Sequence, residues 1–278
     1  MLFHDAAQMY LEQDRENLSP LTIRTYHWNL KKIRDFRPDL DCSEVDEIFV
    51  KELRAHLREK GNKPNTVIKA LSVLRSFSRK MMLDGMIEKN PFERVKIGQV
   101  YTQRGFLSIS ELRKLYQRYF EIGYTLTETE HETMRAFLFS CFTGLRYSDL
   151  RSLDASEIFD WKIRKMTQKT GIPVYIPIPA QARTLLPQKI SAGKIFKVVE
   201  NSRFNRNLQA AAPKLGYYKH IHCHLARHTF ATTCITLGIS LPATSKLLGH
   251  RKMETTLIYA KYVDALLDKE MKKFNKLN

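Results

Sequence analysis

Several features common in other classes of protein are missing from this sequence of 278 residues. No apolar run reaches the roughly 18 residues that a membrane-spanning helix needs, and the opening MLFHDAAQMYLEQD meets acidic residues too early for a signal peptide. There is no internal repeat and no low-complexity tract. The four cysteines form no CxxC pair, so we expect reduced, mostly buried thiols. These absences predict a soluble, globular, cytoplasmic protein.

Acidic residues are scarce relative to basic ones. The chain has 46 lysines and arginines against 29 aspartates and glutamates, which gives a net charge of +17. The excess is uneven, because residues 1–50 hold 6 basic and 10 acidic residues whereas residues 51–100 hold 12 and 5. A basic surface of this size suits a polyanion, and nucleic acid is the commonest polyanion in a cell. The alternative is a basic soluble protein without such a partner.

The first hundred residues have the pattern of helices. In residues 18–36, Ser19 is an expected N-cap and Pro20 the first helical residue. Residues 62–85 repeat apolar residues at helical spacing, and Gly85 is expected to end that helix. Its other face is basic, which suits DNA binding, although a solvated face is the alternative. The predicted DNA-binding residues are Lys69, Arg75 and Arg79.

Residues 98–106 have no clear period and are interpreted as a linker. The linker divides the chain into a small helical domain, residues 1–97, and a larger domain, residues 107–278. We therefore predict a mainly α protein whose larger domain is α+β, with many helices and a small sheet.

Two local patterns are predicted near the start and in the middle of the larger domain. Ser108 and Glu111 have the spacing of a capping box, which begins a helix. Residues 159–179 alternate apolar residues around a turn at Gly171, which predicts a β-hairpin. The prolines of this segment cannot donate ladder hydrogen bonds, so the hairpin is expected at a sheet edge.

Charged residues gather in three runs of the larger domain. In TGLRYSDL, Arg146 stands where an apolar helix ends, and a buried arginine needs an anionic partner such as Asp149. A structural ion pair is the simpler interpretation. In HLARHTFAT, His224 and Arg227 share a helical face. His228 lies four residues after His224, the spacing of the two histidines in a common zinc-protease motif. We reject a zinc site because that motif needs a glutamate directly after the first histidine, where this sequence has Leu225.

The third run, GHRKMETTLIYAKY, places His250 nine residues before Tyr259, with Tyr262 close behind. With the two arginines and Lys169 on the hairpin, these residues suit metal-free cleavage of a phosphodiester, which needs cations, a proton donor and a nucleophile. A tyrosine has a pKa of about 10, so a base or a cationic site must favour its ionisation. His224 is a candidate base. The alternative is that both tyrosines only pack.

The segments TGLRYSDL, KTGIPVYIPI, HLARHTFAT and LGHRKMETTLIYAKY occur in the order and spacing of one family. On these motifs the chain resembles the tyrosine recombinase (phage integrase) family over essentially its whole length. The resemblance implies that residues 1–97 are the SAM-like core-binding domain and residues 107–278 the catalytic domain. The segments ARHTFAT and TTLIYAKY are similar to those of integrases from bacterial mobile elements.

The resemblance implies four residues around the scissile phosphate. Arg146 and Arg227 match the two catalytic arginines, which hold the phosphate. His250 matches the residue that positions the phosphate, and Asp149 matches an acidic residue that supports the site.

The resemblance also implies the residues that move protons and attack. Tyr259 matches the nucleophile, whereas Tyr262 is expected to pack. His224 matches the base or proton shuttle for the tyrosine. Lys169 matches the hairpin lysine that protonates the leaving oxygen, although other lysines lie close to it in the sequence.

The implied reaction is site-specific recombination through a 3′-phosphotyrosyl intermediate, without metal, ATP or another cofactor. Strand exchange proceeds through a Holliday junction, with four protomers on two duplexes and possible accessory DNA-bending proteins. The C-terminal helix, residues 263–277, is expected to dock on a neighbouring protomer, or else on its own domain. We expect an N-terminal arm-binding domain to be absent or removed. The activity is expected to be integration, excision or inversion of a mobile element near the nucleoid. The alternatives are relaxation of DNA by a type IB topoisomerase and a non-cleaving DNA-binding protein.

Overall fold

A computed structural model describes residues 1–98, 105–188 and 192–260. The chain divides into two compact units, residues 1–102 and residues 103–278. Most of the expected linker, residues 98–106, lies outside the described residues. Within the described ranges no helix is long and apolar enough to cross a membrane. All four cysteines are free and buried, as expected from their spacing.

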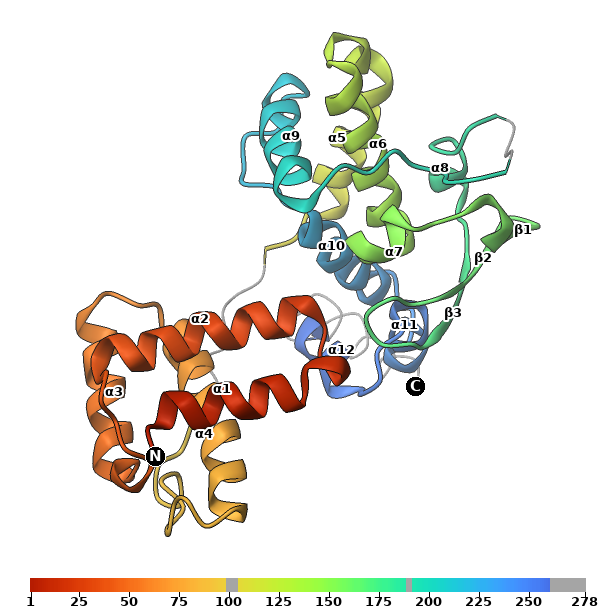
Figure 1. The fold of residues 1–278 in the computed structure, drawn as a ribbon. Coiled ribbons are helices and arrows are strands. Elements are labelled where there is room, and N and C mark those ends of the chain that lie inside the picture. The colour runs from red at the N-terminus through yellow and green to blue at the C-terminus, as the bar shows by residue number, and fades with distance from the viewer. Residues whose placement is uncertain (99–104, 189–191, 261–278) are drawn as a thin grey trace, which may run out of the picture. The chain divides into compact units, whose positions relative to one another are not determined.

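The described part of the first unit is built from helices (Figure 1). The two helices predicted from their end signals form as expected, because Ser19 caps its helix by accepting a hydrogen bond from the Thr22 amide and Gly85 ends its helix at a φ of 72°. One core holds the unit together, and its largest buried side chains include Phe3, Phe49 and Leu74. The helices are α1 Phe3–Gln13, α2 Pro20–Phe36, α3 Glu47–Glu59 and α4 Pro64–Leu83.

The second unit packs helices around a small sheet. Helix α6 contacts both α9 and α10, and it carries much of the apolar core. The capping box at Ser108 and Glu111 is present at the start of α5. The helices are α5 Ile109–Ile122, α6 Glu128–Thr143, α7 Tyr147–Arg151, α8 Ala180–Arg183, α9 Asn201–Lys214, α10 Cys223–Thr236, α11 Leu241–Leu248 and α12 Glu254–Ala260.

The sheet is antiparallel and has the order β1-β2-β3, so β3 lies at an edge as its prolines predicted. Ile163 pairs with Ile176 across β2 and β3, and both side chains are buried, whereas the neighbours of Ile176 along β3 are exposed. The predicted fold class, mainly helical with a small sheet, is confirmed. The strands are β1 Ile158–Phe159, β2 Lys162–Met166 and β3 Pro173–Pro177.

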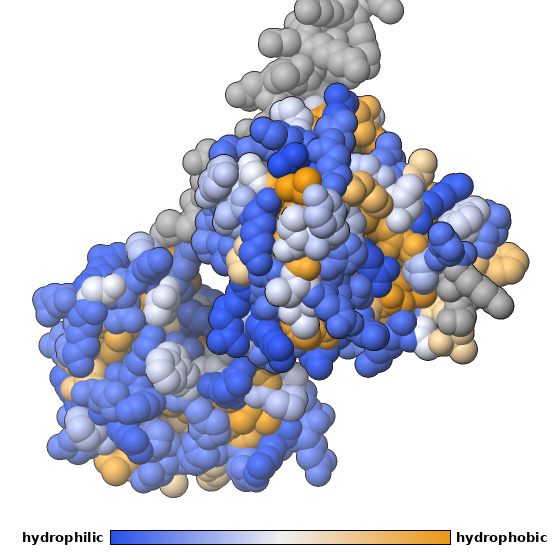
Figure 2. Space-filling model, turned by 90° about the horizontal axis from the view of Figure 1, so that it is seen from above, coloured by the Kyte–Doolittle hydropathy of each residue, from blue (hydrophilic) through white to orange (hydrophobic). Residues whose placement is uncertain are grey.

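The described surface is largely polar. Figure 2 shows hydrophilic residues over most of the visible face of each unit, with apolar residues in separate patches. This is the surface expected from the high content of charged residues.

Candidate functional site

Arg146 and Arg227 form what we call the arginine cluster of the second unit, and Arg227 is its more deeply buried member. It lies on α10 and is only 7% exposed. Its Nη1 donates a hydrogen bond of 2.8 Å to the carbonyl of Gly144, and its Nη2 donates one of 2.5 Å to the carbonyl of Leu248. The guanidinium therefore joins the loop after α6 to the end of α11, and these bonds offset the cost of burying its charge.

Arg146 approaches the same place from the start of α7. Its Nη2 donates to the carbonyl of Gly249 at 3.4 Å. Its Nη1 is 3.9 Å from Oδ2 of Asp149, and within the described part of the chain neither of these two buried atoms has a hydrogen-bond partner. The ion pair predicted from the sequence is thus a loose one. A buried guanidinium nitrogen without a hydrogen bond favours an additional anionic partner.

The two arginines and Tyr259 influence one another electrostatically. Burial lowers the pKa of Arg146 below its ordinary value, while Asp149 and Tyr259 raise it. The pKa of Arg227 is lowered to about 9, mainly by burial and then by the charge of Arg146, against the opposite effect of Tyr259 and Asp149. Two cations held together away from water favour the binding of an anion between them.

Tyr259 reaches this cluster from α12 of the same chain. Its side chain is 3% exposed and packs in a small core with Phe230 and Leu248. Its hydroxyl lies 2.9 Å from Nδ1 of His228. The ring therefore does pack, as the simpler hypothesis held, but its hydroxyl contacts a histidine and the tyrosine interacts electrostatically with both arginines.

The turn after α11 connects these parts. Gly249 has a left-handed φ of 59°, and an added Cβ would lie 2.7 Å from Cγ1 of Val174 on β3, so a side chain does not fit there. The carbonyl before the turn binds Arg227 and the carbonyl within it binds Arg146. His250 follows directly, and its Nδ1 is 2.8 Å from Oγ1 of Thr256 on α12. The turn thus holds both arginines and the helix of Tyr259.

The β2–β3 hairpin is tied to the cluster through Asp149. Oδ1 of Asp149 accepts a hydrogen bond of 2.8 Å from the amide of Gln168, beside Lys169. Lys169 is exposed at the tip of the hairpin. The other two lysines of the hairpin are ion-paired, Lys162 with Asp160 at 2.6 Å and Lys165 with Glu157 at 2.7 Å.

Two histidines of α10 occupy different places. His224, the base implied by the resemblance, is exposed in the first turn of the helix. His228, one turn later, contacts the hydroxyl of Tyr259. The sequence suggested His228 only as a zinc ligand, and nothing in its motif distinguishes it from His224 as a neighbour of the tyrosine.

The close approach at Gly144 predicts a stability effect. Gly144 ends α6 at a φ of 70°, and an added Cβ would lie 2.4 Å from Cδ1 of Phe230. We expect Gly144→Ala to lose about 2–4 kcal/mol of unfolding free energy, from backbone strain plus overpacking. Gly238→Ala is the matched control, since Gly238 has a φ of 85° with no atom within 4 Å of the added Cβ. Urea denaturation measures both, and equal losses would exclude the contact with Phe230.

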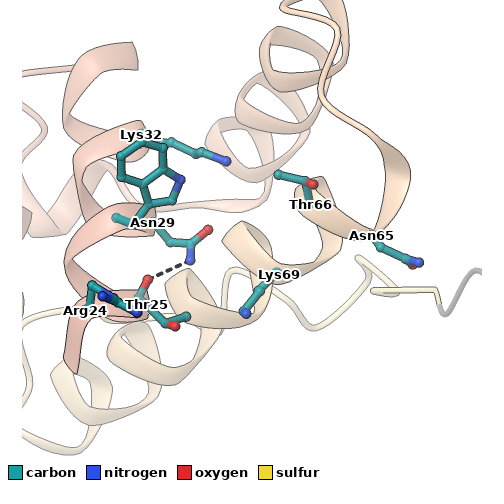
Figure 3. Close-up of a pocket in the computed structure, with 8 residues that line it drawn as sticks. Arg24, Thr25, Asn29, Lys32, Asn65, Thr66 and Lys69 are labelled. Carbon is teal, nitrogen blue, oxygen red and sulfur yellow. Dashed lines mark hydrogen bonds between the residues drawn. The ribbon is translucent and has the colours of Figure 1, made fainter. Parts of the chain in front are cut away.

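A groove between α2 and α4 is the main candidate for nucleic-acid binding in the first unit. Its volume is about 590 Å³ and no acidic residue lines its described walls. Figure 3 shows Arg24 and Lys32 on α2 and Lys69 on α4 among its polar side chains. Trp28 also lines the groove and is 64% exposed. We call this surface the α2–α4 groove.

The three basic residues predicted to bind DNA divide between two hollows of α4. Lys69 lines the α2–α4 groove, whereas Arg75 and Arg79 line a second hollow of about 970 Å³. All three are exposed. The contribution of α2 to the groove was not predicted, because a sequence pattern does not reveal which helices pack side by side.

Two sequence families match this chain. The phage integrase family matches residues 106–265, and the phage integrase SAM-like domain matches residues 2–97. The chain belongs to the phage integrase family. The resemblance inferred from the motifs is confirmed, and this phage integrase family member is a tyrosine-type site-specific recombinase.

Individual relatives agree with this membership. Tyrosine recombinase XerC of Oceanobacillus iheyensis is 27% identical, with 93% of this chain and 90% of that protein covered. Tyrosine recombinase XerC of Bacillus subtilis is 27% identical over 89% of this chain and 88% of that protein.

Solved structures agree in fold. An integrase fragment of the Tn1549 transposon, in complex with a circular intermediate DNA, has a TM-score of 0.75 at 17% identity, with 93% of this chain and 95% of that chain covered. A λ integrase tetramer bound to a Holliday junction has a TM-score of 0.73 at 19% identity, with 93% and 77% covered.

Proposed function

We propose that this phage integrase family member cleaves and rejoins DNA through a covalent bond to Tyr259. The phenolic oxygen attacks the scissile phosphorus, the bond from phosphorus to the 5′ oxygen breaks, and a 5′-hydroxyl leaves with a proton. The resulting 3′-phosphotyrosyl ester retains the bond energy, so a 5′-hydroxyl from a partner duplex reverses the step without ATP. One observation carries the proposal: both guanidinium groups bind carbonyls at the end of α11, where the ring of Tyr259 packs on Leu248, and both interact electrostatically with Tyr259.

The arginines bind the non-bridging phosphate oxygens in this proposal. Nη1 of Arg146 is buried without a hydrogen bond in the described part of the chain, so a phosphate oxygen supplies the missing partner. Arg227 keeps its two carbonyl partners and uses its remaining N–H groups. Both cations neutralise charge as the pentavalent transition state forms. His250 positions the phosphate, and Asp149 supports Arg146 and the hairpin.

Proton transfer is assigned to two exposed residues. His224 accepts the proton of the tyrosine, and Lys169 gives one to the 5′ oxygen. Their exposure in the DNA-free protein fits this assignment, because each would be covered by bound DNA rather than by the protein. Lys169 is favoured over Lys162 and Lys165 because both of those ammonium groups are held in ion pairs.

We further propose that four protomers recombine two duplexes through a Holliday junction, in integration, excision or inversion of a mobile element. The λ integrase relative, a tetramer on such a junction, supports this assembly. The predicted docking helix, residues 263–277, lies outside the described residues, so its binding to a neighbour stays a prediction, as does the packing of Tyr262.

The test is to sequence DNA trapped covalently on the protein. Host genomic fragments are incubated with the protein in EDTA without ATP, the complexes are denatured, and the attached DNA is recovered. We expect enrichment of a defined DNA sequence, because a site-specific enzyme becomes attached at the same position in every fragment that carries its site. Attachment at random positions would support relaxation of DNA instead. The absence of any covalent DNA, with binding retained, would support a non-cleaving DNA-binding protein.

The α2–α4 groove predicts a salt-dependent contribution to DNA affinity. Lys69→Gln removes one exposed cation from a groove whose described lining holds no acidic residue, so DNA binding weakens and the slope of log affinity against log salt falls by about 1. Lys51→Gln is the matched control, since Lys51 on α3 is exposed and already paired with Glu47 at 2.7 Å. Fluorescence anisotropy at several salt concentrations measures both. Equal slopes for the two variants would exclude the groove as a phosphate contact.

A further inference from the structure

The resemblance assigns no role to His228, yet it contacts the proposed nucleophile. We propose that His228 is a positioning residue for Tyr259: the hydrogen bond between its Nδ1 and the phenolic hydroxyl fixes where the attacking oxygen lies. This inference rests on the proposed function of Tyr259. It differs from the role of His224, which is to accept the proton.

The geometry of α10 places the phosphate clamp and the tyrosine support side by side. Arg227 and His228 are consecutive, so their side chains leave the helix about 100° apart. Arg227 points to the carbonyls of Gly144 and Leu248, whereas His228 points to the hydroxyl of Tyr259. One turn of one buried helix therefore sets the position of both the phosphate ligand and the nucleophile.

Tyr259 lies in the described part of α12, Glu254–Ala260, and its ring and its hydroxyl are held by different kinds of contact. Packing against Phe230 and Leu248 fixes the ring, but apolar contacts tolerate sliding and rotation. A hydrogen bond of 2.9 Å to His228 restricts the oxygen itself.

The other histidines of the site contact different groups. His250 bonds to Thr256, three residues before Tyr259, and so orients the start of α12. His224 lies one turn before His228 in an exposed position. His250 thus holds the helix of the nucleophile and His228 holds its hydroxyl.

The first test compares His228→Ala with His228→Asn. The amide of asparagine reaches about as far as Nδ1 of histidine, so it can keep the hydrogen bond but cannot take the proton. Covalent attachment to a cleavable DNA site should slow about 100-fold in His228→Ala, with DNA affinity unchanged, because small displacements of a reacting atom cost rates of this order. His228→Asn should regain most of the rate. Equal rates for His228→Ala and the unaltered protein overturn the proposal, and so does a His228→Asn variant as slow as His228→Ala.

The second test needs no DNA. With 3-fluorotyrosine in place of Tyr259 in the full chain, the fluorine NMR signal reports the surroundings of the hydroxyl. His228→Ala should shift this signal and His228→Asn should largely restore it. If His228→Ala does not fold, His228→Phe fills the position without a polar atom. If the fluorine chemical shift is the same in these variants as in the unaltered protein, the positioning role is overturned. A signal that responds, in a protein that never attaches to DNA, overturns the proposed function and leaves the contact established.

Discussion

Tyr259→Phe abolishes covalent attachment to DNA while leaving DNA binding intact. The substitution removes one oxygen and keeps the ring, which packs at 3% exposure against Phe230 and Leu248, so the fold is retained. One hydrogen bond to His228 is lost, which costs about 1 kcal/mol of unfolding free energy. Loss of an enzyme nucleophile lowers the rate by up to a factor on the order of a million. Denaturing gel electrophoresis of the protein with labelled DNA measures the attachment.

The control for this prediction is Tyr262→Phe. It makes the same chemical change three residues away, and it should form the covalent complex at the unaltered rate. Attachment by Tyr259→Phe, or loss of attachment only in Tyr262→Phe, would transfer the role of nucleophile to the second tyrosine.

Arg227→Ala lowers the cleavage rate at least about 100- to 1,000-fold, because it removes a preorganised donor from the developing charge on phosphate. DNA affinity changes little, since many other phosphate contacts support binding. The carbonyls of Gly144 and Leu248 each lose a hydrogen bond, so the variant is also less stable. Cleavage should therefore be measured at a temperature below the unfolding transition of the variant, as a single-turnover rate with saturating protein.

Arg135→Ala is the matched control for this loss of stability. Arg135 also binds two backbone carbonyls, those of Leu185 and Ile195, and it pairs with Glu132 at 2.7 Å. None of these partners belongs to the arginine cluster. The control should lose stability and keep its cleavage rate. A common loss of rate in both variants would mean that Arg227 acts through folding alone.

The fold was predictable where it depends on short-range signals. The N-cap at Ser19, the capping box at Ser108 and the helix end at Gly85 each satisfy backbone groups a few residues away. The strand β3 lies at a sheet edge because its prolines have no N–H to donate. Such features follow from local chemistry, so the sequence suffices for them.

The arginine cluster was predictable in its residues but not in its contacts. Arg227 binds carbonyls that lie 83 and 21 residues away in the chain. Because every residue has a backbone carbonyl, the sequence does not show which ones the arginine binds. The partner predicted for Arg146 was Asp149, yet they are 3.9 Å apart, and the same carboxylate accepts a hydrogen bond from the hairpin. Such long-range choices depend on how helices pack.

His228 illustrates the same limit within one motif. Both histidines of HLARHTFAT lie one turn apart on α10, and only the docking of α12 decides which one meets Tyr259. The groove lined by Arg24 and Lys69 depends likewise on the packing of α2 against α4. Periodicity identifies a helical face, but it does not identify the partner of that face.

The most direct measurement is the identity of the bond between protein and DNA. A covalent complex trapped on a DNA site is digested with nuclease and protease, and the modified peptide is sequenced by mass spectrometry while the free DNA end is labelled. The account predicts a nucleotide joined through its 3′-phosphate to the phenolic oxygen of Tyr259, and a 5′-hydroxyl at the newly cut end of the released strand. A nucleotide on another residue, or a 3′-hydroxyl at that newly cut end, would contradict it.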